Sequence, residues 1–320
     1  MKRRLGPVLA IACVLIGCGS DEPAAETPSP SWELRAPMEV DRSEIAAAVR
    51  DGQIYVAGGI QQLGLTDQAE VYDEATDGWS RAPALPRALH HVAMVGCGGE
   101  VYASGGYTSL TFERDEDPTL WRLGANGWDA VTSLPEPLGE HAMACIDGSV
   151  HIVGGNTDDG PTGAFRRWDA PTWVDLPSLP TPRHSTAVAV VDGWLYVFGG
   201  RDESSSQLDV VEAFDVAAGA WEARAPLPVG RGGHAAAASG GVVHVVGGEL
   251  LGDDVVLDLH DLYDAATDTW TSGPPLPEAR HGLAAVTIGE RIYAIGGGSE
   301  AGVRTVASTT GTLQVLGDFE

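Results

Sequence analysis

The sequence predicts an all-β fold: a six-bladed β-propeller of four-stranded antiparallel blades, its ring closed by pairing of N-terminal and C-terminal strands. Three observations predict it: a glycine pair that recurs six times, a fixed set of residues between the copies, and a partial repeat at each end of the chain. The pairs follow apolar, strand-like runs at intervals of 47, 49, 45, 48 and 49 residues, at Gly58-Gly59, Gly105-Gly106, Gly154-Gly155, Gly199-Gly200, Gly247-Gly248 and Gly296-Gly297. A period of about 50 residues is typical of a propeller, in which no single small sheet can bury its faces alone.

Each copy contains four short β-type runs, which predicts four strands per blade. The turns between the first two runs include Asp51-Gly52, Asp147-Gly148 and Asp192-Gly193, dipeptides that favour the positive φ of two-residue hairpins. The outer half of the unit has an aromatic residue followed by Asp, then a turn, then a tryptophan, at Trp79, Trp128, Trp173, Trp221 or Trp270.

A mismatch between the two ends of the chain predicts how the ring closes. Apolar runs at residues 303–307 and 313–316 follow the sixth glycine pair, but no tryptophan does, whereas Trp32 precedes the first pair without a repeat of its own. Trp32 lies ten residues before Arg42, the spacing found in three later copies. We therefore assign Trp32 to the outer strand of the sixth blade, which removes an exposed sheet edge. The alternative is that residues 312–316 form that outer strand and Trp32 lies outside it.

These motifs resemble the Kelch family. Gly-Gly after an Ile-Tyr-Val type of strand, Tyr-Asp followed by Thr and Trp, and Pro-Arg-His before the next strand are its signature, most complete at residues 263–270. The resemblance covers residues 32–316 and implies a propeller that binds other proteins. The second and third copies depart from it, since Leu120-Trp121-Arg122 replaces the Tyr-Asp pattern and Leu138 stands where other copies have Arg.

The first 31 residues predict export and lipidation. Lys2, Arg3 and Arg4 precede an apolar stretch at residues 5–16 that is too short to span a bilayer, so residues 1–17 are expected to be a signal peptide. Residues 15–18 resemble the bacterial lipobox, which implies acylation of Cys18 and anchoring in the membrane through acyl chains. Residues 18–31 read as a tether to the propeller domain at 32–320. The expected location is the cell envelope, on the outer membrane or the periplasmic face; an ordinary signal peptide with an incidental cysteine is the alternative.

The charge of the chain limits its partners. The formal charge is −26, and removal of residues 1–17, which carry three basic residues and no acidic one, makes it −29. Such an acidic protein lacks the basic surface that nucleic-acid binding requires, and it is repelled by anionic lipid surfaces. We expect a monomer that binds a protein or carbohydrate ligand.

Two cysteines remain in the propeller domain, Cys97 and Cys145, near the ends of the first strands of adjacent blades. Their registers relative to the glycine pairs differ by one residue, and one step along a strand reverses the direction of a side chain. A disulfide in an oxidising compartment and two buried thiols are the alternatives. Neither cysteine has the CxxC spacing of a redox or zinc site.

The loops that enter the first strands predict a ligand site at one mouth of the channel. Five arginines precede these strands and are expected to ring the mouth: Arg42, Arg87, Arg183, Arg231 and Arg280. Histidines are expected beside them: His90, His91, His141, His184, His234 and His281. The loops between second and third strands are acidic, which predicts a basic floor with acidic walls.

Two interpretations of this arginine ring remain open. In Kelch repeats Arg and His are common at this position, so the arginines could simply bond to neighbouring loops. Kelch adaptor proteins also use arginines at this rim to hold acidic peptides, and the resemblance thus implies a mouth that recognises a protein loop or an acidic or polar glycan.

The sequence favours binding over catalysis. It has no HExxH, GxSxG or P-loop motif and no paired zinc-ligand spacing, so we expect no cofactor and no metal. Two enzyme families share this fold, copper radical oxidases and sialic-acid epimerases; an exported sugar-acid enzyme of the epimerase type is the functional alternative. Calcium at the oxygen-rich runs 156–159 and 249–258 is a further one, although their spacing does not match an EF-hand.

Overall fold

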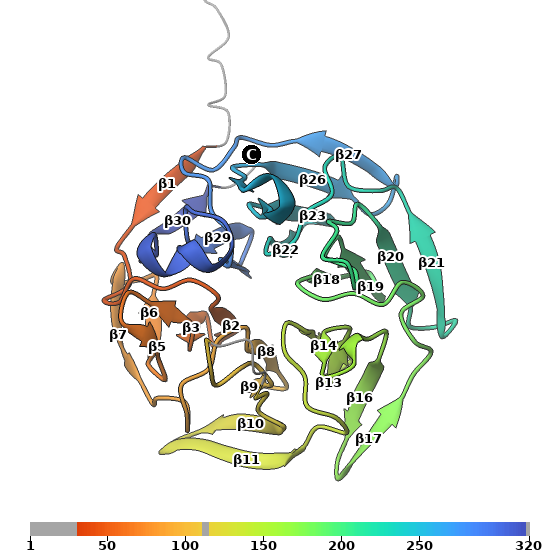
Figure 1. Ribbon diagram of the computed structural model, residues 1–320, viewed down its shortest axis with the longest axis horizontal. Coiled ribbons are helices and arrows are strands. Elements are labelled where there is room, and N and C mark those ends of the chain that lie inside the picture. The colour runs from red at the N-terminus through yellow and green to blue at the C-terminus, as the bar shows by residue number, and fades with distance from the viewer. Residues whose placement is uncertain (1–30, 111–114, 318–320) are drawn as a thin grey trace, which may run out of the picture. The chain divides into compact units, whose positions relative to one another are not determined.

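A computed structural model describes residues 31–110 and 115–317, which belong to one compact unit. Six four-stranded antiparallel sheets are arranged as blades around a central channel (Figure 1). The first strand of each blade lies next to the channel, where it contacts the first strands of the neighbouring blades. The predicted six-bladed propeller is therefore confirmed.

In blades 1 to 3 the strands follow one another in chain order from the channel outward. Blade 1 is β2 (Ala46–Arg50), β3 (Gln53–Ala57), β6 (Ala69–Asp73) and β7 (Gly78–Ala82). Blade 2 is β8 (Ala93–Cys97), β9 (Glu100–Ser104), β10 (Thr119–Gly124) and β11 (Gly127–Ser133). Blade 3 is β12 (Ala142–Ile146), β13 (Ser149–Val153), β16 (Phe165–Asp169) and β17 (Thr172–Asp175), with the hairpin β14 (Asn156–Thr157) and β15 (Gly160–Pro161) at its rim.

Blades 4 and 5 have the same arrangement, and blade 6 differs in its outer strand. Blade 4 is β18 (Ala187–Val191), β19 (Trp194–Phe198), β20 (Val211–Asp215) and β21 (Ala220–Arg224). Blade 5 is β22 (Ala235–Ser239), β23 (Val242–Val246), β26 (His260–Asp264) and β27 (Thr269–Ser272). Blade 6 is β28 (Ala284–Ile288), β29 (Arg291–Ile295), β30 (Leu313–Leu316) and, from the start of the chain, β1 (Trp32–Arg35).

The sixth blade closes the ring as the spacing of Trp32 predicts. β1 pairs antiparallel with β30, Trp32 opposite Leu316 and Arg35 opposite Leu313, so the start of the chain supplies the outer strand (Figure 1). The alternative, with residues 312–316 as the outer strand, is wrong because β30 is the third strand, between β29 and β1. This pairing joins the two ends of the described chain by backbone hydrogen bonds and leaves blade 6 with the same four strands as the others.

The hydrophobic core is divided among the interfaces between blades. Ile54 and Val56 of blade 1, for example, pack in one cluster with Tyr293 and Ile295 of blade 6. The innermost strands are rich in alanine, as in β22, because six strands converge at the channel and leave little room for large side chains. No blade has a complete core of its own, which explains why the ring must close.

The outer tryptophan of each blade fastens it to the preceding blade. Trp79 donates its indole N–H to the carbonyl oxygen of Ala36 at 2.7 Å, and Trp32 donates to Pro274 at 2.9 Å. The other four tryptophans of this set do the same across the remaining interfaces: Trp128 to Pro83, Trp173 to Ser133, Trp221 to Pro177 and Trp270 to Ala225. The tryptophan motif of the sequence is therefore a connection between blades.

The glycine pair makes the corresponding connection near the mouth. The second glycine donates its backbone N–H to the loop of the next blade, as Gly155 does to Arg183 at 3.0 Å and Gly297, across the ring closure, to Arg42 at 2.9 Å. The first glycine cannot be replaced without a clash, since a Cβ on Gly105 would lie 2.2 Å from the Leu138 carbonyl oxygen. Both glycines of each pair have positive φ, which glycine adopts at low cost.

Cys97 and Cys145 form a disulfide, with a Cα–Cα distance of 5.3 Å, that joins β8 of blade 2 to β12 of blade 3. The one-residue difference in register does not separate them, because the two strands belong to different sheets and alternation within a strand does not decide contacts between blades. Of the two alternatives left open by the sequence, the structure has the disulfide.

The remaining elements lie at the rim: the hairpin β4 (Ile60–Gln61) and β5 (Gly64–Leu65), the hairpin β24 (Glu249–Leu250) and β25 (Val255–Val256), and the 3-10 helices η1 (Leu251–Asp253) and η2 (Gly302–Ala307). Within residues 31–110 and 115–317 no helix is long and apolar enough to cross a membrane. The predicted signal peptide, the lipidation site Cys18 and nearly all of the tether lie outside the described residues.

Candidate functional site at the mouth of the channel

Three positions in each blade build the mouth. Two are consecutive residues in the loop that enters the innermost strand, and the third directly follows the glycine pair. The first and third positions form an isolated antiparallel bridge in every blade, for example His184 with Arg201 and Gly139 with Asn156. The middle position follows the first and faces the channel entrance.

We call the six middle positions the collar: Glu44, His91, Glu140, Ser185, Gly233 and Gly282. All six have left-handed backbone conformations, with φ between 51° and 65°. Glycine adopts this conformation freely, whereas other residues adopt it at a cost of about 1–3 kcal/mol each. Four blades nevertheless carry a larger residue here, which indicates that these side chains serve a purpose other than backbone fit.

Backbone hydrogen bonds connect the collar residues from blade to blade. His91 donates to Glu44 at 3.1 Å, Glu140 to His91 at 3.3 Å and Ser185 to Glu140 at 3.0 Å. Gly233 donates to Ser185 and Gly282 to Gly233, and Ile45 closes the circle by donating to Gly282. The collar is therefore a continuous ring with a fixed position for each of its side chains.

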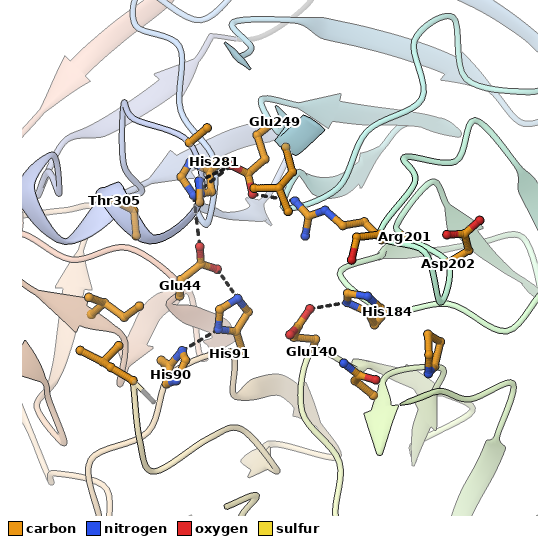
Figure 2. A pocket seen from close by; sticks show the side chains of 18 of the residues that line it. Glu44, His90, His91, Glu140, His184, Arg201, Asp202, Glu249, His281 and Thr305 are labelled. Carbon is orange, nitrogen blue, oxygen red and sulfur yellow. Dashed lines mark hydrogen bonds and ion pairs between the residues drawn. The ribbon is translucent and has the colours of Figure 1, made fainter. Parts of the chain in front are cut away.

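Glu44 pairs with two histidines. Its carboxylate oxygens lie 3.0 Å from Nε2 of His91 and 3.4 Å from Nε2 of His281 (Figure 2). Burial alone lowers the pKa of His91, but the charge of Glu44 and its hydrogen bond raise that pKa to about 9. Burial alone raises the pKa of Glu44, but His91 and His281 hold it well below its usual range. The group is thus an ion pair at neutral pH.

His90, whose Nδ1 lies 2.7 Å from Nδ1 of His91, has its pKa lowered to about 4 by burial and by the charge of His91.

Glu140 is held by its neighbours in blades 2 and 4. It bonds to Nδ1 of His184 (Figure 2). The same oxygen accepts from the hydroxyl of Ser185, and its other oxygen accepts from Tyr107 at 3.2 Å. Burial raises the pKa of Glu140, but His184 and His91 outweigh burial and lower it. Ser185 and Glu140 both contact the same nitrogen of His184, so the three do not form a nucleophile–base–acid relay.

A second ion pair is joined to Glu140 through the hydroxyl of Ser185. Arg201 donates to Glu249 at 2.6 Å and to the hydroxyl of Ser185 at 2.9 Å. The second oxygen of Glu249 accepts from the backbone N–H of Gly302 at 2.8 Å and lies 3.6 Å from Nε2 of His281 (Figure 2). Burial lowers the pKa of His281, but Glu44 and Glu249 raise it above its ordinary value. The floor therefore contains three carboxylates that are each paired with a cation or an imidazole.

A cavity of about 930 Å³ lies above this floor, a volume that can accommodate several side chains of a partner. Loops of blades 3 and 4 form an acidic wall, which we define as Asp158, Asp159, Asp202 and Glu203. Apolar side chains of the other four blades, which we call the apolar wall, line the rest of the cavity together with the Arg304–Asp254 ion pair: Ile60, Leu110, Leu251, Ala301 and Val306. The predicted acidic walls are thus present on one side, but the floor is a network of paired carboxylates and imidazoles.

The predicted arginine ring is wrong as a lining of the mouth. Arg42, Arg183, Arg231 and Arg280 are fully buried inside their own blades, and none lines the cavity. They bond to a carboxylate or amide on the third strand and to backbone carbonyls: Arg42 to Glu70, Arg183 to Glu212, Arg231 to Asp261 and Arg280 to Gln314. We call these four the arginine layer. Their position, two residues before the collar, places them beneath it.

Three other predicted positions also differ from expectation. His141 is buried and does not line the cavity, and its Nε2 lies 2.8 Å from the hydroxyl oxygen of Ser104. Arg87 is half exposed and pairs with Asp117 at 3.2 Å, because Leu89 occupies the place of the buried arginine in blade 2. His234 is buried below the collar, where its Nε2 lies 3.1 Å from the carbonyl oxygen of Phe198, and burial holds its pKa well below the ordinary value. His184, His281, His90 and His91 line the cavity as expected.

No group of three or more potential metal ligands is found in the described part of the chain. The oxygen-rich runs at 156–159 and 249–258 contribute residues to the cavity, but their side chains do not converge on one point. Both described cysteines are joined in the disulfide, so neither is a free thiol for a cross-link to tyrosine.

Three residues that the sequence did not single out are central to the site, Glu44, Glu140 and Arg201, while Asn156 and Glu249 stood out only as members of the oxygen-rich runs. A signal for all five exists in the repeats. They occupy the collar position or the position after the glycine pair, where the six copies differ from one another while the flanking residues repeat. Positions that vary between copies of one scaffold are free to carry function, whereas those that repeat maintain the scaffold.

Comparison with known proteins supports the repeat assignment. The model of the KLHDC2/KLHL20/DRC7 Kelch-repeats domain matches residues 90–298, and the Kelch motif matches residues 41–86. Kelch-like protein 40 of Mus musculus is 39% identical over 85 residues, which are 27% of this chain and 14% of that protein. Kelch-like protein terF of Aspergillus terreus is 33% identical over 94 residues, 27% of this chain and 20% of that protein.

These relatives share a limited segment with this chain, since the matched regions span a fifth or less of their own lengths. Their whole-protein activities therefore do not transfer to this chain. The family model extends over more than half of the sequence, and the six blades carry the glycine pairs and tryptophans of the repeat throughout. The chain belongs to the Kelch-repeat family.

Proposed function

We propose that this propeller is a binding module that docks a loop of a partner protein into the cavity at the mouth of its channel. The observation that carries the proposal is the distribution of exposed apolar side chains. Of the five large ones in the described residues, four lie on loops between second and third strands: Leu63, Leu110, Leu251 and Val255. Two of these, Leu110 and Leu251, line the cavity. Exposed apolar groups gathered around a cavity are typical of a protein-binding surface.

The rigidity of the site favours binding. The collar is hydrogen-bonded around the ring, and the charged side chains of the floor are held by one another. A preformed cavity loses little entropy when a partner enters, so more of the contact energy contributes to affinity. On the described floor, the one serine beside a histidine and a carboxylate lacks the geometry of a relay, and nothing there favours the sugar-acid enzyme as a second candidate.

The docking proposal can be tested by cross-linking in the cells that make the protein. A photoreactive amino acid replaces Leu110 or Leu251 at the mouth, and Leu34 on the outer strand β1 is the matched control because it is also exposed. We expect the same protein adduct from both mouth positions and none from position 34. Equal adducts at position 34, or none at either mouth position, would contradict the proposal.

We also propose that Cys18 is acylated and that the module works on the cell envelope. The support is the basic start of the chain, the short apolar stretch and the Leu15-Ile16-Gly17-Cys18 sequence. Labelling with an alkyne-tagged fatty acid should mark the protein in the membrane fraction. Cys18→Ala should abolish the label and Cys13→Ala, a control within the same segment, should retain it; a label that survives Cys18→Ala would refute this anchor.

A further inference from the structure

We propose that the partner loop inserts a basic side chain, arginine or lysine, between the acidic wall and the apolar wall of the cavity. This inference rests on the proposed docking function and adds the chemistry of the group that is recognised. An arginine-lined mouth would select a negatively charged ligand, whereas the proposed ligand group is positively charged.

The cations of the mouth already have anionic partners. Arg201 pairs with Glu249 at 2.6 Å, and Arg304 pairs with Asp254 and lies 3.8 Å from Glu300. The sequence contains one lysine, Lys2, which lies outside the described residues. An acidic ligand would therefore have to displace an existing carboxylate from its partner.

The acidic wall, in contrast, contains carboxylates that are not neutralised by a cationic partner within the described ranges. Within the described ranges, Asp158, Asp159 and Glu203 form no ion pair, and Asp202 accepts hydrogen bonds from the hydroxyl and backbone of Ser204 and from the backbone of Ser206. The four carboxylates come from two neighbouring loops, the β14–β15 hairpin and the loop at 201–207. A guanidinium or ammonium group entering between these loops would be attracted by all four.

A buried acceptor below this wall supplies an independent observation. Asn156, the first residue of β14, lines the cavity, is 3% exposed, and its Oδ1 accepts no hydrogen bond from the residues that the structure describes. Buried side-chain oxygens are ordinarily satisfied, and one without a donor is costly. A donor N–H on an inserted basic group would satisfy it.

The apolar wall determines what should flank the basic group. Leu110 and Leu251, on the blades next to the acidic wall, are partly exposed, and Ile60 and Val306 line the same cavity. Arginine and lysine have apolar stems that pack on such surfaces while their charged ends reach polar groups. We therefore expect the basic residue to be followed or preceded by an apolar residue in the loop.

The test uses a displayed library of short, disulfide-closed peptide loops selected on the full-length protein. We expect enriched loops that contain Arg or Lys beside an apolar residue, and that lose binding to a Leu110→Ser, Leu251→Ser variant. Enriched loops that depend on the mouth but carry Asp or Glu would overturn this inference and leave the docking function intact. Failure to enrich any loop that depends on the mouth would overturn both.

A charge-matched pair of variants then locates the contact. Asp158→Asn, Asp159→Asn, Asp202→Asn should weaken the selected loop by about tenfold or more, as should replacement of its basic residue by norleucine. The control Glu33→Gln, Asp129→Asn, Glu222→Gln removes the same charge from exposed outer strands and should leave affinity within about twofold. Equal losses in both variants would indicate general attraction to an acidic protein and would refute the proposed contact.

Discussion

The arginine layer and the collar lie two residues apart in the same loops, yet they have opposite roles. Arg183 and Arg231 are completely buried and hold the third strands of their own blades. Glu140, two residues after the corresponding position in blade 3, faces the cavity. The difference shows that one loop provides both the internal support of a blade and the surface that a partner contacts.

The two layers also differ in how they vary within the chain. The arginine recurs in four of the six blades, and its partner on the third strand is an acid or an amide in each: Glu70, Glu212, Asp261 or Gln314. The collar has Glu, His, Glu, Ser, Gly and Gly in turn. A residue that recurs with its partner maintains the repeat, and a residue that changes from copy to copy distinguishes one sector of the mouth from another.

Removal of a buried arginine should have the largest effect on stability. Arg231→Met leaves Asp261, its partner at 2.8 Å, as an unpaired buried charge and removes donors from the carbonyls of Val229 and Val245. We expect the free energy of unfolding to fall by about 3–5 kcal/mol. Denaturant unfolding measures it.

The double variant Arg231→Met, Asp261→Leu removes both charges and should recover part of that loss. Affinity for a partner loop should stay unchanged in the fraction that remains folded, because Arg231 does not line the cavity. A loss of affinity at unchanged stability would place Arg231 in the binding site and remove the distinction between the layers.

The next largest effect is expected in the blades that lack the arginine. Leu89 and Leu138 occupy its position in blades 2 and 3, and the Cys97–Cys145 disulfide joins those same blades. Cys97→Ser, Cys145→Ser opens a covalent loop with a sequence separation of 48 and should cost about 2–4 kcal/mol.

Unfolding under oxidising and reducing conditions checks this disulfide effect. The wild-type protein should lose stability when reduced, and the double serine variant should show no difference between the two conditions. Equal stability of oxidised wild type and variant would mean that the disulfide does not reinforce these blades.

The architecture was predictable because each blade repeats the same solution to the same packing problem. The glycine pairs mark points where a Cβ would collide with the next blade, and the tryptophans mark the outer hydrogen bonds between blades. Because these residues recur in six copies, they can be recognised in a single sequence. Trp32 predicted the ring closure for the same reason, since its spacing to Arg42 matched that of the complete copies.

The site was less predictable than the fold, because the recurring charged residues of the repeat, the arginines, are not the residues that line the cavity. Arg42 and Arg280 are charged, and a charged residue is ordinarily expected at the surface, but here hydrogen bonds to backbone carbonyls allow complete burial. The collar depends on a left-handed backbone and on hydrogen bonds between blades, and neither is visible in a list of residue types. The side on which blades 3 and 4 bring Asp158 and Asp202 together likewise depends on three-dimensional loop geometry.

The ion pair of the collar should make the stability of the protein depend on pH. The pKa of His91 in the fold is about 9, above its ordinary value near 6.5, so its contribution is complete below the ordinary value and is lost as the pH rises through 9. That contribution is at most about 3 kcal/mol, since part of the side chain is exposed. Thermal unfolding of wild type and His91→Gln at pH values from 6 to 10, the range implied by this shift, measures it.

The wild type should lose more stability than His91→Gln across that interval, and the two curves should converge at its alkaline end. Parallel curves would show that the His91–Glu44 pair does not couple to folding. Below about pH 9 the buried arginines should contribute little, since even Arg280 has a pKa of about 10, so the slope there separates the collar from the arginine layer.

The smallest effect on stability is expected in blade 6, where the buried arginine has an uncharged partner. Arg280 bonds to Gln314, whereas its counterparts in blades 1, 4 and 5 bond to carboxylates, and burial lowers the pKa of Arg280 to about 10. Gln314→Glu would place a carboxylate where the repeat has one in the other three blades. The attraction offsets the cost of desolvating the new charge, and we expect a gain of about 1 kcal/mol in unfolding free energy. A loss of stability would mean that blade 6, closed by β1, does not accommodate the ion pair that supports the other blades, and that the arginine layer is not equivalent around the ring.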